Sequence, residues 1–121
     1  MSGVDVYNAV TSVPIGEDAF MPCAHMVFPA SSAPSLPFCV YYLDEMDGFA
    51  ADNTLHARRN NWVVEHYWED YDEDIERALE EAIMENFGAF TKTETWIDDE
   101  NCAETAYYFA EIEREEQYES E

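Results

Sequence analysis

Three aspartates at alternating positions, Asp70, Asp72 and Asp74, form the arrangement in this sequence that comes nearest to a calcium-binding loop. Such a loop places carboxylate ligands at its first, third and fifth positions and needs a glycine at the sixth position for a sharp turn. The sixth position here is Ile75. We therefore expect these aspartates to mark the capped, acidic start of a helix, and we predict no metal site there.

Thiol and imidazole groups, which suit zinc, are spread along the chain at Cys23, His25, Cys39, His66 and Cys102. Their spacing matches no closed zinc motif. A cysteine–histidine nucleophilic pair could be drawn from the same residues, but no orienting carboxylate or oxyanion donor can be assigned to it. We expect these residues to pack in the core, and the odd number of cysteines favours a reducing compartment.

Other catalytic patterns are missing from the sequence. The four glycines are scattered and fit neither a phosphate-binding loop nor a dinucleotide-binding fingerprint. No carboxylate pair for glycoside hydrolysis can be singled out among 28 acidic residues. We therefore expect a protein that is not an enzyme and that needs no cofactor.

The charge is the most unusual bulk property, because 28 Asp and Glu face only five Lys and Arg, which makes the net charge -23 at pH 7. Seven of the acidic residues precede Arg58 and 21 follow it. Binding to phosphate backbones is disfavoured, since it requires cationic side chains. The simplest role of the charge is solubility. The hydrophobic share of 47% still predicts folding. We expect one domain over residues 1–113 and an acidic, flexible tail over residues 114–121.

The N-terminal third predicts one helix and one strand. Apolar residues recur at helical spacing from Val4 to Val13, and Pro14 closes the pattern. The segment from Phe20 to Phe28 is rich in strand formers, but Pro22 restricts it to a sheet edge. The first ten residues lack an export pattern, and no run of 18 apolar residues occurs, so we expect no membrane span.

Two further strands are predicted at Leu36–Leu43 and Trp62–Trp68, where apolar residues alternate. We expect them to pair as an antiparallel hairpin. The intervening segment contains the Arg58–Arg59 pair and is predicted to form a loop of about 18 residues, a length typical of functional or mobile loops.

The segment "DYDEDIERALEEAIMENFG" predicts a helix that Asp72 caps and Gly88 ends. A closing hairpin follows in "FTKTETWI" and "ETAYYFAEIE", with a turn at Asp98–Asn101. The predicted order is α-β-β-β-α-β-β. It indicates a single α+β domain in which two helices pack on a mainly antiparallel sheet.

Four segments in this order, "LPFCVYY", "GFAADN", "WVVEHYWEDYDEDIERALEEAI" and "FTKTETWIDDENCAETAYYFAEI", resemble small proteins encoded among the neck and tail genes of long-tailed phages. These are the tail terminator, tail completion or tail-to-head joining proteins. The resemblance covers roughly residues 36 to 112. The stretch "IGEDAFMPCAHMVFPASSAPS" departs from the pattern because it looks longer than the family's usual short link.

The resemblance implies a subunit of a homo-oligomeric ring, a hexamer, that caps the finished tail tube in the virion neck and meets the head closure or connector protein. It implies assembly in the host cytoplasm, no catalysis and no membrane contact. DNA would pass through the ring without specific binding. Two sets of residues are candidates for these roles. An oligomer or partner interface would use Phe49, Asp52, Asn53, Arg58 and Arg59, and an acidic lumen would use Asp72, Glu73, Glu76, Glu80 and Glu81.

Three alternatives stay open. The two arginines could instead only balance Asp44, Glu45, Asp47 and Asp52 in their own segment. The chain could be an acidic mimic of DNA that blocks a host defence protein, because rows of carboxylates can imitate phosphates. It could also be another neck component, such as a head closure protein.

Overall fold

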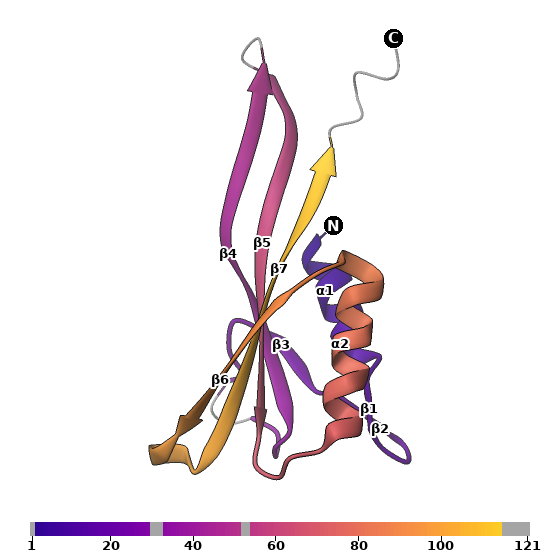
Figure 1. Cartoon of the computed structure of the whole chain (residues 1–121), viewed down its shortest axis with the longest axis vertical. Helices are drawn as coiled ribbons and strands as arrows, with labels where there is room; N and C mark the ends of the chain where they lie inside the picture. The colour runs from indigo at the N-terminus through magenta and orange to yellow at the C-terminus, as the bar shows by residue number, and fades with distance from the viewer. Residues whose placement is uncertain (1, 30–32, 52–53, 115–121) are drawn as a thin grey trace.

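A computed structural model describes residues 2–29, 33–51 and 54–114 (Figure 1). In these ranges the chain forms two α-helices and a mainly antiparallel sheet, which confirms the predicted α+β fold. The elements are α1 (Ser2–Thr11), β1 (Pro14–Gly16), β2 (Ala19–Phe20), β3 (Cys23–His25), β4 (Phe38–Ala51), β5 (Thr54–Trp68), α2 (Glu73–Phe87), β6 (Thr91–Ile97), the short 3-10 helix η2 (Asp98–Glu100) and β7 (Cys102–Arg114).

The main sheet has the strand order β3-β4-β5-β7-β6. Its pairs are antiparallel except for β3 and β4, which run parallel, and β1 with β2 forms a separate small hairpin. Both helices lie on one face of the sheet (Figure 1). The core is the layer between them, formed by apolar side chains of α1, α2 and the inner face of β4, β5 and β7: Val6, Val10, Cys39, Tyr41, Trp62, Val64, Leu79, Ile83, Tyr107 and Phe109.

Helix α2 forms as predicted. The Asp72 carboxylate accepts hydrogen bonds from the backbone N–H groups of Asp74 and Ile75, at 3.0 and 3.2 Å. These bonds satisfy two N–H groups that the first turn leaves without partners. At the other end Gly88 has φ 95, which lies in the region that favours glycine, and its N–H bonds to the Met84 carbonyl.

The N-terminal third is divided into more and shorter elements than the sequence predicted. The helix predicted from Val4 to Val13 covers Ser2–Thr11, and β1 and β2 were not predicted. The strand expected over Phe20–Phe28 is reduced to Cys23–His25, because Met26 has φ 72 and leaves the extended conformation. It does lie at a sheet edge, as predicted.

The prediction of a long loop between the two central strands is wrong. β4 runs to Ala51 and β5 starts at Thr54, so nearly all of that segment is an antiparallel ladder, with register shifts between Leu43 and Glu45 and between Phe49 and Ala50. We call residues 44–51 and 54–61 the arm. It projects past the helices, and β7 accompanies it as far as Arg114, opposite Ala57 (Figure 1). The acidic tail predicted for residues 114–121 lies, apart from Arg114, outside the described residues.

Candidate functional site

The two arginines of the arm point to opposite faces of the sheet, as successive strand residues must. Arg59 lies opposite Asp47 on β4 and Ile112 on β7, on the face away from the helices. Arg58 lies opposite Gly48 and Glu113, on the other face. A single flat partner surface therefore cannot meet both side chains.

Phe49, predicted as an interface residue, is 49% exposed on the arm. It lies opposite Ala57, on the same face as Arg59, and lines a shallow hollow with His56, Ala57, Ile112 and Arg114. An exposed aromatic ring beside cationic groups is typical of a protein contact surface. The other two predicted interface residues, Asp52 and Asn53, lie outside the described residues.

The five predicted lumen residues do not form one solvent-facing row. Glu76 and Glu80 turn toward β6, where Lys92 Nζ lies 2.9 Å from one carboxylate and 2.7 Å from the other. The Tyr107 hydroxyl also donates to Glu80 at 3.0 Å. These two glutamates therefore hold α2 on the sheet and are only partly available to a passing ligand.

The remaining three lumen candidates are exposed. Asp72 caps the helix, and Glu73 pairs with Arg77 one turn later at 2.8 Å. Glu81 is exposed on the same helix. The aspartates at positions 70, 72 and 74 mark a capped helix start, as predicted, because Asp72 is the N-cap and Asp74 lies inside α2.

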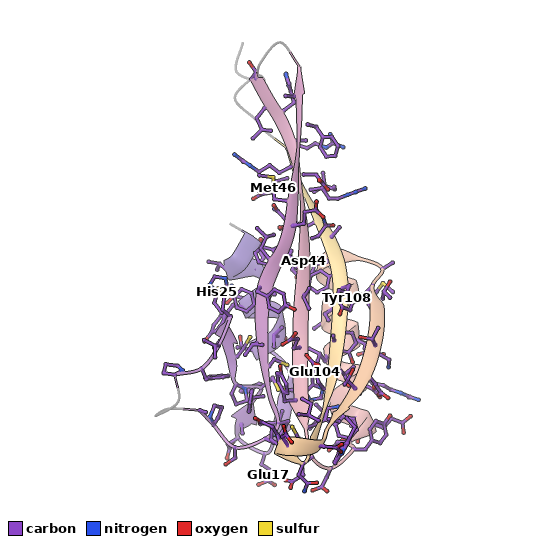
Figure 2. The ribbon with its side chains drawn as sticks, turned by 90° about the vertical axis from the view of Figure 1, so that its left-hand side faces the viewer. Glu17, His25, Asp44, Met46, Glu104 and Tyr108 are labelled. Atoms are coloured by element: carbon purple, nitrogen blue, oxygen red, sulfur yellow. The ribbon has the colours of Figure 1, made fainter. Side chains whose placement is uncertain are left out.

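The face of the sheet away from the helices carries a carboxyl pair that sequence reasoning missed. Glu65 accepts hydrogen bonds from the hydroxyls of Tyr42, at 2.9 Å, and Tyr67, at 2.7 Å. Tyr67 also reaches Glu104 at 3.4 Å. Figure 2 views this face, with Glu104 and Tyr108 in front of the helices. Burial, followed by the hydrogen bond and charge of Glu65, raises the pKa of Glu104 to about 7.

The positions of Glu65 and Glu104 in the sequence could have indicated on which face of the sheet they lie. Both glutamates lie in predicted strands two positions from apolar residues, Val63 and Tyr67 for Glu65 and Ala106 for Glu104, where a strand with one solvated face normally alternates polar and apolar residues. Alternation alone assigns them to the solvated face. It does not reveal that their partners come from a neighbouring strand, because that depends on register.

Cys39, His66 and Cys102 are buried as predicted and Cys23 is half-buried against the core, but the core position predicted for His25 is wrong because that side chain is exposed at the sheet edge. Cys23, Cys39 and His66 are neighbours in register across β3, β4 and β5. Burial raises the pKa of the Cys23 thiol to about 12 and raises that of Cys39 as well, so the reactive thiolate form is disfavoured. Among the described residues, no group of three or more His, Cys, Asp or Glu is placed to hold a metal ion.

His66 is the unusual member of this row. It is 4% exposed, and neither imidazole nitrogen has a hydrogen-bond partner among the described residues. Burial lowers its pKa to about 4, although the nearby Glu76 charge opposes the shift. The ring lines a pocket of about 230 Å³ between the end of β5 and the start of α2. Polar and aromatic residues from the end of β5 and the segment that follows it, Trp68, Glu69, Asp70, Tyr71 and Asp72, line one part of it, and the apolar side chains of Ile15, Leu36, Pro37 and Ile75 line another.

None of the helices in the described ranges is long and apolar enough to cross a membrane. Comparison of the chain with models of known protein families and with curated proteins finds no match.

Proposed function

We propose that this chain is a structural subunit of a phage virion. Copies of it form a ring at the head-proximal end of the tail tube, where the ring terminates the tail and joins it to the head connector. The protein assembles in the host cytoplasm and stays in the neck of the virion. It performs no catalytic step and uses no cofactor.

The observation that carries this proposal is the arm. A ladder of this length outside the core, with exposed apolar side chains, has no evident role in a chain that works alone. Exposed apolar residues lie on both faces of the arm and of the adjoining sheet: Leu43 and Met46 on the face of Trp62, and Phe49, Tyr108 and Ile112 on the face of Arg59, each between 42% and 51% exposed. A closed ring of identical subunits uses two different patches on each subunit, and an arm with a separate body supplies them.

The charge supports passage of DNA through such a ring. A net charge of -23 repels a polyanion, so DNA would meet no adhesive surface in the lumen. Glu81 is the exposed lumen candidate on α2 that takes no part in helix capping or in the contacts with Lys92 and Arg77. A lumen built from the arm instead would bring Arg59 toward the DNA and contradict this arrangement.

A DNA mimic is the weaker alternative. A mimic needs an unbroken row of available carboxylates, whereas Glu73, Glu76 and Glu80 on α2 are paired with Arg77 or Lys92. Mimicry also gives the arm no role.

Mass measurement by light scattering after size exclusion tests the ring, and electron microscopy of the assembled particle places the chain. We expect a ring of six copies at the tube end. The Phe49→Asp variant should lower the assembled fraction, whereas Val4→Asp is the matched control because Val4 is an exposed apolar residue on α1, 64% exposed, and is not part of the arm. A monomer or dimer that binds a basic host protein would refute the ring and favour the mimic. Density at the connector instead of the tube end would assign the chain to head closure.

A further inference from the structure

The pocket beside His66 has the chemistry of a site for one cationic side chain. Its volume of about 230 Å³ is below the roughly 300–1,000 Å³ of pockets that hold small organic ligands. Four carboxylates line it, and Trp68 and Tyr71, with ring centroids 5.7 Å apart, add aromatic surface. Carboxylates and aromatic rings together are the partners that a guanidinium prefers.

Two of the carboxylates are available to a ligand. Asp72 is engaged by the helix N-terminus, and Glu76 by Tyr71 and Lys92. Glu69 and Asp70 are exposed and form no ion pair within the described part of the chain. Because the Asp72 side chain already accepts from the first N–H groups of α2, the positive end of the helix dipole is capped and opposes a cation less.

His66 is the second observation that points to a ligand. A neutral imidazole has one nitrogen that donates and one that accepts, and a buried polar group without a partner costs free energy. Both nitrogens of His66 lack a partner among the described residues, and the ring forms one wall of the pocket. An N–H group from a guanidinium would satisfy the accepting nitrogen.

The chain itself offers the complementary group on the arm. Of its five Lys and Arg, Arg77 and Lys92 are paired inside the body, and Arg58, Arg59 and Arg114 lie on or beside the arm. Arg59 faces away from the helices with half of its side chain exposed. Its partner Asp47 is 3.9 Å away, and an exposed pair of this kind is weak enough to exchange.

The contact cannot form within one chain. Arg59 and His66 are seven positions apart on β5, which corresponds to roughly 23 Å at about 3.3 Å per strand residue. The two also occupy opposite faces of the sheet, since Arg59 and His66 differ by an odd number of positions. The arginine must therefore come from another molecule.

We propose that the pocket lined by His66, Glu69 and Asp70 receives Arg59 from the arm of a neighbouring copy. This inference depends on the proposed ring, because arm and pocket are then the two different patches of one head-to-tail contact. In a chain of net charge -23, this pairing also offsets part of the repulsion between copies.

Charge exchange tests the contact. Arg59→Glu and Asp70→Arg should each weaken self-association at least about tenfold, the low end for a charge pair buried in an interface. The chain carrying both changes should recover most of the association, because the pair is re-formed with opposite signs. Arg77→Glu, on the exposed side of α2, is the matched control for Arg59→Glu, and Asp99→Arg, on an exposed turn of the body, is the matched control for Asp70→Arg.

A spectroscopic measurement follows the pocket itself. The imidazole resonances of His66 should differ between the assembled wild-type chain and the monomeric Arg59→Glu chain. N-acetyl-arginine amide added to the Arg59→Glu chain should shift the same resonances, and the shift should vanish in a chain that also carries Glu69→Gln and Asp70→Asn.

The outcomes separate this inference from the proposed function. A ring of normal size and stability in both single variants would overturn the contact and leave the ring intact. A wild-type chain that stays monomeric would overturn both. If Asp70→Arg blocks binding to the tail tube but leaves self-association unchanged, the occupant is an arginine of the tube protein, and the assignment to Arg59 is wrong.

Discussion

Arg59 and Asp47 face each other across the arm, with Nη1 and Oδ2 3.9 Å apart and each side chain about half exposed. An exposed pair at this distance contributes little to folding, and it competes with any outside partner for the guanidinium. This pair is therefore one observed case in which an arginine of the arm balances an acidic residue of its own segment, as the alternative interpretation expected. The same geometry leaves Arg59 ready to exchange partners on assembly.

Asp47→Asn should therefore separate folding from assembly. We expect the free energy of unfolding in urea to change by less than about 0.5 kcal/mol. Self-association should tighten a few-fold, since Arg59 no longer has a competing carboxylate. Asp44→Asn removes the same charge from the arm without touching Arg59 and serves as the control. Equal tightening in both variants would mean that only net charge had mattered.

Lys92 should be the cation whose loss costs most stability. In Lys92→Met, Glu76 and Glu80 lose the ammonium group that lies between them, at 2.9 and 2.7 Å. Because Lys92 is about one-third exposed, we expect a loss of about 1–2 kcal/mol at pH 7, less than for a fully buried pair. Arg77→Met, which breaks a pair with both side chains more than half exposed, should cost about 0.5 kcal/mol or less.

The stability that is lost in Lys92→Met should depend on pH, and the direction of this dependence follows from the pKa of Glu76. Burial opposes ionisation of Glu76, but hydrogen bonds from Tyr71 and Lys92 outweigh it and lower its pKa. A lowered carboxyl pKa stabilises the fold above the unfolded pKa of about 4.3, and this stabilisation is lost as the pH falls below it. The difference between wild type and variant should therefore shrink in acid. A difference that stays constant from pH 7 to pH 3 would refute the electrostatic explanation.

Helix α2 could be predicted from sequence because several signals agree there. Asp72 marks its start and Gly88 marks its end. The apolar stripe at Leu79 and Ile83 marks the face that is buried. The arm could not be predicted in this way. Its β4 half is largely exposed on both faces, and in its β5 half the buried residues Ala57 and Asn60 lie three positions apart, so the alternation of apolar and polar residues that identifies a half-buried strand is absent from "DEMDGFAADNTLHARRNN".

Some residues of the candidate site could likewise be named from the sequence, and others could not. Phe49, Arg58 and Arg59 were identified because an aromatic ring and cations are conspicuous in an acidic chain. The Glu65–Glu104 pair and the pocket at His66 depend on the register of β5 with β7 and on the packing of α2, and no local pattern encodes either. From the sequence, His66 was only one of five candidate zinc or nucleophile residues that we expected to pack in the core, and no pattern indicated the pocket beside it.

Glu104→Gln should stabilise the fold in base. The pKa of Glu104 is raised to about 7, from an unfolded value near 4.3. A raised pKa contributes stability that is complete below the unfolded pKa and is lost as the pH rises through the folded pKa. Above pH 7 the wild-type chain therefore has two adjacent carboxylates, Glu65 and Glu104, and the amide removes one charge. We expect a gain of about 1–2 kcal/mol at pH 8 and little difference at pH 5, measured by urea unfolding. Glu94→Gln, on the exposed edge strand β6, is the control and should show no such dependence.

His66→Leu should stabilise the isolated chain, with the larger effect in acid. Burial lowers the pKa of His66 to about 4, below its unfolded value near 6.5. The histidine therefore contributes stability above pH 6.5 that is lost as the pH falls toward 4, because the unfolded chain takes up the proton first. Leucine removes this linkage and also removes two polar nitrogens without partners among the described residues. We expect a gain of about 1 kcal/mol at pH 7 and more at pH 5 in urea unfolding of the monomeric Arg59→Glu chain. If the pocket receives Arg59, the same substitution in the wild-type background should weaken self-association, so that a more stable subunit assembles less well. Greater stability together with unchanged assembly would mean that His66 has no part in the contact.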